Sequence, residues 1–150
     1  MSYNRLQTGR CSEPEREYFI TFATHNRIRV FDDFHSARIL IQQLSQLDED
    51  NCLFPQAWVV MPDHVHILAI LGAVCSLSEC MQQLKGRSSR IINGHQGEHH
   101  PPLWQPGFYD RALRSEEDRL AIARYIVANP LRAGLVKRLA DYPHWDSVWL

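Results

Sequence analysis

The chain has 150 residues, of which 45% are hydrophobic, and a formal net charge of −1 at pH 7. This length suits one domain with a core of its own and leaves little room for a second. The apolar runs are short and are interrupted near Pro62, which excludes a bilayer-spanning helix. The first residues lack an apolar signal segment and the cysteines form no CxxC pair, so we expect a cytoplasmic protein with reduced thiols.

The first half of the chain predicts a strand, a helix and a β-hairpin. Residues 18–24 are rich in aromatic and β-branched side chains, which favours a strand. Between residues 34 and 47 apolar side chains recur at spacings of three and four, the period of an amphipathic helix. The β-rich runs 54–61 and 64–71 are separated by the turn-forming pair Pro62-Asp63 and predict two antiparallel strands.

The middle of the chain predicts a second helix, an irregular loop and a further strand. Ser76 or Ser78 can cap the helix, whose apolar stripe extends to Asn93-Gly94. Residues 94–106 contain glycines, adjacent prolines and histidines, a composition typical of a loop. Residues 108–113 then return as a strand.

A third helix is expected to begin at Ser115, which can cap it and is followed by acidic residues. It should end just before Asn129, because Pro130 biases that residue away from helical geometry. We expect a single domain with a core at about residues 17–138 and a C-terminal tail at 139–150. The order of elements predicts an α+β, ferredoxin-like sandwich in which helices pack on one face of an antiparallel sheet.

Charge is distributed unevenly along the chain. Residues 1–83 carry 6 Lys or Arg against 10 Asp or Glu, whereas residues 84–150 carry 10 against 7. The basic half is therefore the candidate surface for phosphate groups. For any single basic residue, an ordinary solvated position on a helix is the alternative.

His64 and His66 form the most informative pair, at the start of the second hairpin strand. Strand side chains alternate between faces, so these two imidazoles project from the same side and can reach one divalent ion. A structural histidine pair on a half-buried strand is the alternative. The other histidines have no partner at ligand spacing and are interpreted as structural or exposed.

The third helix carries a second chemical pattern, formed by Tyr125 and Asn129. Residues four apart on a helix share a face, so the phenol and the amide can approach the same point. Amides and imidazoles are acceptable ligands for Mg²⁺ or Mn²⁺, and a phenol attacks phosphate poorly unless a metal polarises the phosphodiester. A tyrosine that only packs on the sheet is the alternative.

Three motifs taken together resemble the REP-associated tyrosine transposases, which belong to the single-tyrosine branch of the HUH endonucleases. They are the segments MPDHVHIL at 61–68, WQPGFYD at 104–110 and RYIVANPLRAGLV at 124–136. The resemblance implies an HUH motif on a central strand and a nucleophilic tyrosine on a helix. It also implies repeated extragenic palindromes as the substrate, which are short DNA hairpins with a flanking unpaired tetranucleotide.

The resemblance also implies roles for individual residues. His64 and His66 match the metal ligands, Tyr125 matches the nucleophile, and Asn129 matches the place of a third ligand. Expected contacts to DNA come from a basic stretch, from one arginine beside the tyrosine and from aromatic residues that can stack on unpaired bases. These residues are Lys85, Arg87, Arg90, Arg124, Trp104, Phe108 and Tyr109. Core packing is the alternative for at least one of the aromatic residues, and Tyr109 is the alternative nucleophile.

The expected reaction is strand transfer on single-stranded DNA. Tyr125 would attack in line, giving a 5′-phosphotyrosine and a free 3′-OH, and a second 3′-OH could then displace the tyrosine without ATP. One alternative is a metal-dependent nuclease that uses water, and another is an inactive module that binds hairpin DNA or RNA. We expect a nucleoid-associated monomer, with a homodimer as the alternative.

Overall fold

A computed structural model describes residues 12–94 and 102–150 of the chain. It contains a five-stranded antiparallel sheet with the strand order β4-β1-β3-β2-β5. The strands are β1 (Glu17–Ala23), β2 (Leu53–Val60), β3 (His64–Leu71), β4 (Tyr109–Ala112) and β5 (Trp145–Ser147). The α-helices are α2 (Phe34–Glu49), α3 (Leu77–Asn93), α4 (Arg119–Val127) and α5 (Asn129–Arg132). The expected loop at 94–106 lies largely outside the described residues.

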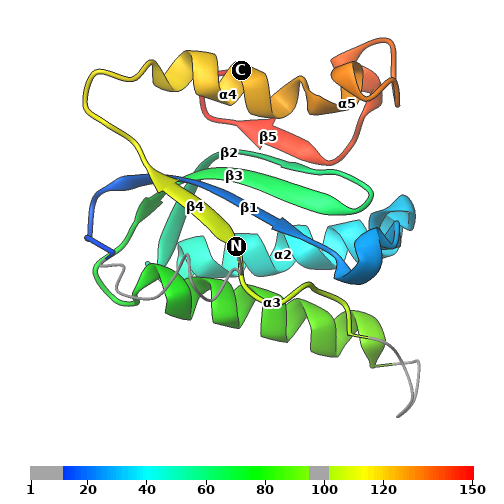
Figure 1. Ribbon diagram of the computed structural model, residues 1–150, viewed down its shortest axis with the longest axis horizontal. Helices are drawn as coiled ribbons and strands as arrows, with labels where there is room; N and C mark the ends of the chain where they lie inside the picture. Colours follow the sequence, from blue (N-terminus) through cyan, green and yellow to red (C-terminus); the bar gives the residue numbers. More distant parts are fainter. Residues whose placement is uncertain (1–11, 95–101) are drawn as a thin grey trace.

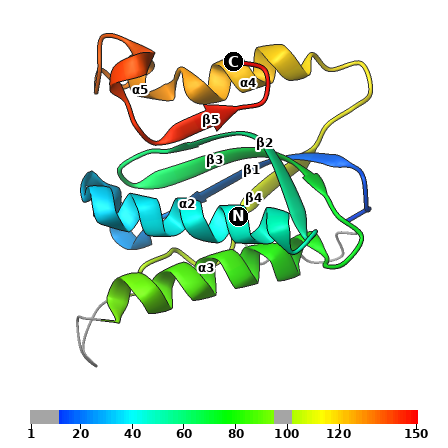
Figure 2. The same cartoon turned by 180° about the vertical axis from the view of Figure 1, so that it is seen from behind.

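The helices cover both faces of the sheet. Figures 1 and 2 show α2 and α3 on one face and α4 with α5 on the other. The first four strands with α2 and α3 have the ferredoxin-like order, so the α+β prediction is confirmed. The expectation that helices pack on one face is wrong for α4. This helix buries Ala123, Ile126 and Val127 against the opposite side of the sheet, where they form a second core.

Strand alternation divides the apolar residues between two cores. On β3, Val65, Ile67 and Ala69 belong to the core beneath α2 and α3. Leu68 belongs to the core beneath α4. His64 and His66 share the parity of Leu68 and therefore lie on the α4 face. Each side of this central strand thus has a different neighbourhood.

The helix boundaries follow from capping. Ser76 caps α3, with Glu79 completing a capping box, as the sequence predicts for one of its two alternatives. Helix α4 begins at Arg119 with Asp118 as its cap, so the prediction of a start at Ser115 is wrong. The intervening residues form a turn in which the backbone N–H of Arg114 donates to a side-chain oxygen of Glu117 at 2.6 Å.

The expected end of the tyrosine helix at about Ala128 is confirmed, since α4 ends at Val127 with Ala128 as its C-cap. The expectation that Asn129 is not helical is wrong, because Pro130 occupies the first turn of the separate helix α5, where no backbone N–H is required. The segment after residue 138 is not a tail, since β5 pairs with β2 as the fifth strand of the sheet. The buried Tyr142 fixes this segment by donating its hydroxyl to the Val60 carbonyl at 2.6 Å. Among the described residues, no helix is long and apolar enough to cross a membrane.

Candidate active site

His64 and His66 lie side by side on the α4 face of the sheet. Their ring centroids are 4.9 Å apart, and the ring planes are inclined at 78°. Val65 between them is buried in the opposite core. The predicted alternation of these three side chains is therefore confirmed, and the two imidazoles are close enough to approach one small ligand together.

Each of these histidines has a hydrogen-bond partner at Nδ1. His64 Nδ1 lies 2.7 Å from a carboxylate oxygen of Asp63, so this nitrogen carries the proton and donates it. His66 Nδ1 lies 2.8 Å from the hydroxyl oxygen of Thr21 on the neighbouring strand β1. Because His64 Nδ1 donates to Asp63, its Nε2 is the nitrogen that can bind a metal, and His66 Nε2 can do so in the tautomer in which Nδ1 donates to Thr21. Such partners also orient metal-binding imidazoles in known sites.

The electrostatics of the site favour a neutral imidazole at His66. Burial lowers the pKa of His66 to about 4, and the nearby charges of His64, Arg132 and Arg27 lower it further. Burial tends to raise the pKa of Asp63, but its hydrogen bonds with His64 and Arg27 outweigh this effect and lower it. At neutral pH the arrangement is therefore a neutral His66 together with a carboxylate that orients His64. Metal binding requires histidine in this neutral form.

A tight turn beside β1 holds Asp63 in place. Arg27 Nε donates to a carboxylate oxygen of Asp63 at 3.0 Å. The fully buried Thr24 donates its hydroxyl to the Asp63 carbonyl at 3.1 Å. Asn26 and Arg27 both adopt left-handed backbone angles, with φ of 54° and 55°. This conformation is costly for residues other than glycine, and it is retained where the surrounding contacts hold it next to the histidine pair.

Tyr125 is exposed on α4, on the same face of the sheet as the histidine pair. Its side chain is 57% exposed. The guanidinium carbon of Arg132 lies 4.0 Å from the centre of the Tyr125 ring, and Arg132 Nη2 donates to the Tyr125 carbonyl at 2.7 Å. The charge of Arg132 also lowers the pKa of His66, so this arginine contacts the tyrosine ring and acts electrostatically on His66.

The donor set for a metal is small. Among residues 12–94 and 102–150, no group of three His, Cys, Asp or Glu side chains could hold a metal ion. A site at His64 and His66 therefore needs an amide, water or substrate oxygen to complete it. Asn129 is a half-buried residue at the start of α5, directly after the tyrosine helix. Two imidazoles and an amide fit Mg²⁺ or Mn²⁺, which usually retain several water or phosphate ligands.

Comparison with protein families identifies the group to which this fold and these residues belong. The model of the family described as "Transposase IS200 like" matches residues 14–129. The chain belongs to the IS200-like transposase family. The resemblance drawn from the three motifs is confirmed by this match.

Two known proteins illustrate the relationship of this chain to others. It is 33% identical over 107 residues to a REP-associated tyrosine transposase of Escherichia coli strain K12, an alignment that covers 71% of this chain and 61% of that protein. It is also similar to the solved structure of a REP-associated tyrosine transposase bound to a REP hairpin. That comparison has a TM-score of 0.75 and 25% identity, and it covers 97% of this chain and 82% of the other.

Several predicted DNA contacts of this chain lie away from the histidine pair. Trp104 and Phe108 are buried in the core beneath α2 and α3, which contradicts the expectation that they stack on bases. The Trp104 ring packs against Phe22 and Phe31, and its Nε1 donates to the Ser88 hydroxyl at 3.1 Å. The alternative of core packing is the correct one for both residues.

The predicted basic stretch lies on α3, behind the sheet from the histidine pair. Lys85 donates to the carbonyls of Gln105 and Gly107 at 2.7 and 2.5 Å, so it ties α3 to the segment before β4. Arg87 lies 3.8 Å from Asp50 in an ion pair. Arg90 is exposed on α3 and Arg124 is exposed on α4, beside Tyr125. Contacts of these residues with DNA stay predictions.

Thr21, Asp63 and Arg132 contribute to the site but are absent from the sequence-based prediction. Asp63 directly precedes His64, and Arg132 belongs to the same motif as Tyr125, so both carried a local signal. Thr21 carried none, because its role depends on the register that places it beside His66. A hydrogen-bond partner on a neighbouring strand cannot be identified without that register.

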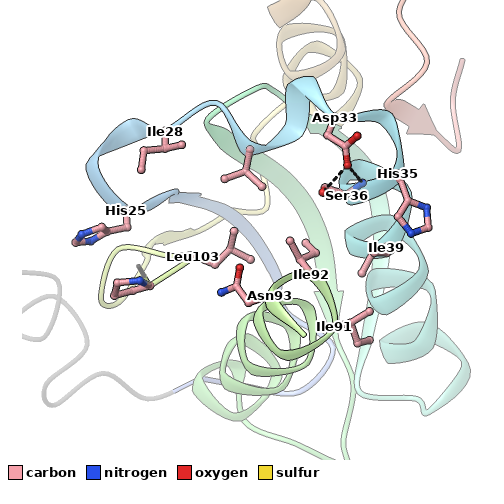
Figure 3. A pocket seen from close by; sticks show the side chains of 12 residues that line it. His25, Ile28, Asp33, His35, Ser36, Ile39, Ile91, Ile92, Asn93 and Leu103 are labelled. Carbon is pink, nitrogen blue, oxygen red and sulfur yellow. Dashed lines mark hydrogen bonds between the residues drawn. The ribbon is translucent and has the colours of Figure 1, made fainter. Parts of the chain in front are cut away.

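A cavity of about 520 Å³ lies elsewhere on the molecule, between the start of α2 and the end of α3. Figure 3 shows mostly apolar side chains such as Ile39 and Ile92 around it, with His25 and His35 at its edges. Asp33 is already engaged there, since its carboxylate accepts hydrogen bonds from Ser36 as the cap of α2. The cavity contains none of the candidate catalytic residues.

Proposed function

We propose that this chain cleaves single-stranded DNA beside REP-type hairpins and rejoins it, with Tyr125 as the nucleophile. The observation that carries the proposal is that the exposed Tyr125 and the adjacent imidazoles of His64 and His66 lie on one face of the sheet. Membership of a transposase family supports the reaction class. Similarity to a transposase bound to a REP hairpin supports the substrate.

The proposed cofactor is Mg²⁺ or Mn²⁺, held by His64, His66 and Asn129. When bound, the ion would polarise the scissile phosphodiester and stabilise charge on its oxygens. Asp63 and Thr21 would orient the two imidazoles through their Nδ1 atoms. The low pKa of His66 supports the proposal, because its imidazole is free of a competing proton at neutral pH.

The bond changes follow from the chemistry of a phenol and a phosphodiester. The Tyr125 oxygen forms a bond to phosphorus, the bond from phosphorus to the 3′-oxygen breaks, and that oxygen leaves as a 3′-OH. The phenol proton passes to solvent and the 3′-oxygen takes up a proton, so the step is balanced. The 5′-phosphotyrosine retains a phosphodiester, so a second 3′-OH can displace Tyr125 without an energy source.

Arg132 is proposed to assist Tyr125. Its guanidinium lies over the phenol ring and is anchored to the Tyr125 carbonyl, so it moves with the nucleophile. This places a fixed positive charge beside the phenol that would attack the phosphate. The same charge would attract the phosphate of an incoming strand.

The test is formation of a covalent protein–DNA adduct. Purified protein is incubated with labelled hairpin oligonucleotides with unpaired flanks, in Mg²⁺, Mn²⁺ or EDTA, and is separated on a denaturing gel. We expect a metal-dependent, protease-sensitive shift for the wild type and for Tyr109→Phe, but none for Tyr125→Phe. Tyr109→Phe is the matched control because it removes the hydroxyl of the other exposed tyrosine on this face.

Other outcomes would select the alternatives. Cleavage without an adduct would indicate a nuclease that uses water. Binding with neither cleavage nor adduct would indicate an inactive recognition module. An adduct that disappears in Tyr109→Phe and persists in Tyr125→Phe would transfer the role of nucleophile to Tyr109.

A further inference from the structure

A groove of about 430 Å³ runs between helix α4 and the sheet edge formed by β4. Such a volume is within the range of small-ligand sites in proteins. Tyr125 stands on the helix side of this groove and Tyr109 on the strand side. The lining residues are Phe19, Tyr109, Arg111, Ala121, Ile122 and Tyr125. The candidate nucleophile therefore lines a groove to which the proposed reaction assigns no part of the substrate.

The sheet register connects this groove to the histidine pair. Tyr109 on β4 is paired with Thr21 on β1, and Thr21 is paired with His66 on β3. Directly paired residues point to the same side of a sheet, so the three side chains form one row on the α4 face. The ring of Phe19 on the groove floor lies 5.6 Å from the ring of His66. The groove thus begins beside the proposed metal ligands.

The chemistry of the groove suits a nucleobase better than a phosphate. Its floor and helix side are apolar, with Phe19, Ala121 and Ile122, and the ring of Tyr109 is 44% exposed. The one cationic side chain among the six lining residues is Arg111. It donates to a carboxylate oxygen of Glu117 at 2.6 Å, so its charge is largely offset. An exposed aromatic face above an apolar floor is the arrangement on which unpaired bases stack.

We propose that this groove binds the unpaired nucleotide attached to the scissile phosphate, with its base stacked on Tyr109. The inference rests on the proposed function, because Tyr125 can attack only a phosphate that lies next to its phenol oxygen. The nucleotide joined to that phosphate must then occupy space beside the Tyr125 ring, and the groove supplies that space. Tyr109 acts through its ring as a stacking residue, and its hydroxyl takes no part in the chemistry.

The test is a double-mutant cycle between Tyr109 and a single base. Tyr125→Phe protein, which cannot cleave, first selects hairpin oligonucleotides from a pool with randomised unpaired flanks. The selected DNA is then prepared with one abasic nucleotide at each unpaired position in turn. Binding of each form is measured by fluorescence anisotropy, with and without Tyr109→Ala.

We expect Tyr109→Ala to weaken binding of intact DNA roughly 5- to 150-fold, the range of one base stacked on an aromatic ring. An abasic nucleotide at one position should cause a similar loss, and the two changes together should cause little further loss. Tyr109→Phe retains the ring and should bind like the parent. Trp149→Ala is the matched control, because it removes a 40% exposed aromatic residue next to β5, at the opposite edge of the sheet.

Independent losses at every abasic position would overturn the inference, as would unchanged binding by Tyr109→Ala protein whose circular dichroism matches the parent. A loss in Tyr109→Phe equal to that in Tyr109→Ala would also overturn it, because the hydroxyl would then be the contact. The cycle measures binding and needs no cleavage. Absence of an adduct with wild-type protein therefore contradicts the proposed function alone. A cycle in which Tyr109→Ala and every abasic nucleotide weaken binding independently contradicts the stacking site alone.

Discussion

The two faces of the sheet differ in how completely they are covered. The face beneath α2 and α3 buries large aromatic and aliphatic side chains, among them Phe22, Phe31 and Trp104. The face beneath α4 has a smaller core and leaves Tyr109 and Tyr125 exposed beside the histidine pair. One face therefore provides stability, and the other leaves room for a substrate. This division places the histidine pair on a rigid sheet without burying it in the main core.

Strand β3 shows the difference between the two faces of the sheet within its eight residues. Its odd-numbered side chains, such as Val65 and Ile67, are fully buried against α2 and α3. Its even-numbered residues His64 and His66 are half-buried on the other face. A shift of one residue in the register would exchange the two sets, so the same pairing that builds the core also positions the proposed ligands.

The largest expected effect is on activity and comes from a change on the face beneath α4. His66→Ala should lower the rate of adduct formation by about 1,000-fold or more, because the proposed ion would lose a ligand, a change of roughly 4 kcal/mol in activation energy. The free energy of unfolding should change far less than the activation energy does. Adduct rates and Mn²⁺ titration calorimetry provide the measurements. His35→Ala, at an exposed histidine on α2, is the control. Equal losses in both variants would contradict the assignment of His66.

A matching change on the face beneath α2 and α3 should lower stability instead of activity. Trp104→Ala should lower the free energy of unfolding by about 3–5 kcal/mol, because it leaves a cavity beside Phe22 and Phe31. Trp104→Phe should cost less, mainly through the lost hydrogen bond to Ser88. Urea denaturation measures both. A loss of DNA binding in Trp104→Phe with stability unchanged would show that the ring contacts DNA after all.

A smaller effect is expected at Asp63, which orients a ligand without binding the metal in our proposal. Asp63→Asn should weaken Mn²⁺ binding by roughly 10- to 100-fold, the usual result of removing a partner of a metal-bound histidine. Asp32→Asn is the control, since that carboxylate pairs with Arg29 at the surface nearby. If both variants bind Mn²⁺ as the wild type does, the contact between Asp63 and His64 has no orienting role.

The sequence predicted most elements correctly wherever a local pattern was sufficient. The hairpin around Pro62 and the cap at Ser76 follow from periodicity and from short-range hydrogen bonding. The start of α4 did not, because Ser115 and Asp118 are both good caps. Contacts between distant residues decide between them, such as the ion pair of Arg119 with Glu17 at 2.9 Å. The strand β5 has three residues and gives no periodic signal of its own.

The same distinction applies to the candidate site. The spacing of His64 and His66, and the placement of Tyr125 on a helix, could be predicted from the sequence because they depend on one element each. The position of α4 could not, since a helix of nine residues carries too short an apolar stripe to indicate which face it covers. Trp104 was assigned to DNA because an aromatic residue in an irregular segment gives no local indication of burial.

The smallest expected effect concerns Lys85, which is half-buried on α3, unlike the exposed Arg90 on the same helix. Burial lowers the pKa of Lys85 from 10.5 to about 8. Between these pH values the unfolded chain binds more protons at this residue than the folded chain, so Lys85 makes the free energy of unfolding rise with pH. We expect a contribution of about 1 kcal/mol, because partial exposure and two carbonyl acceptors offset the cost of burying the charge.

A comparison of the wild type with Lys85→Met isolates this contribution. Burial raises the pKa of the Cys52 and Cys80 thiols to about 11 and about 12, so these groups lower stability as the pH rises above 9.0, and they do so in both proteins. The difference between the two urea denaturation curves should therefore grow in favour of the wild type from pH 8 to pH 10. A difference that stays constant over this range would place the Lys85 ammonium in solvent, where it would be available to DNA phosphates as the basic stretch first suggested.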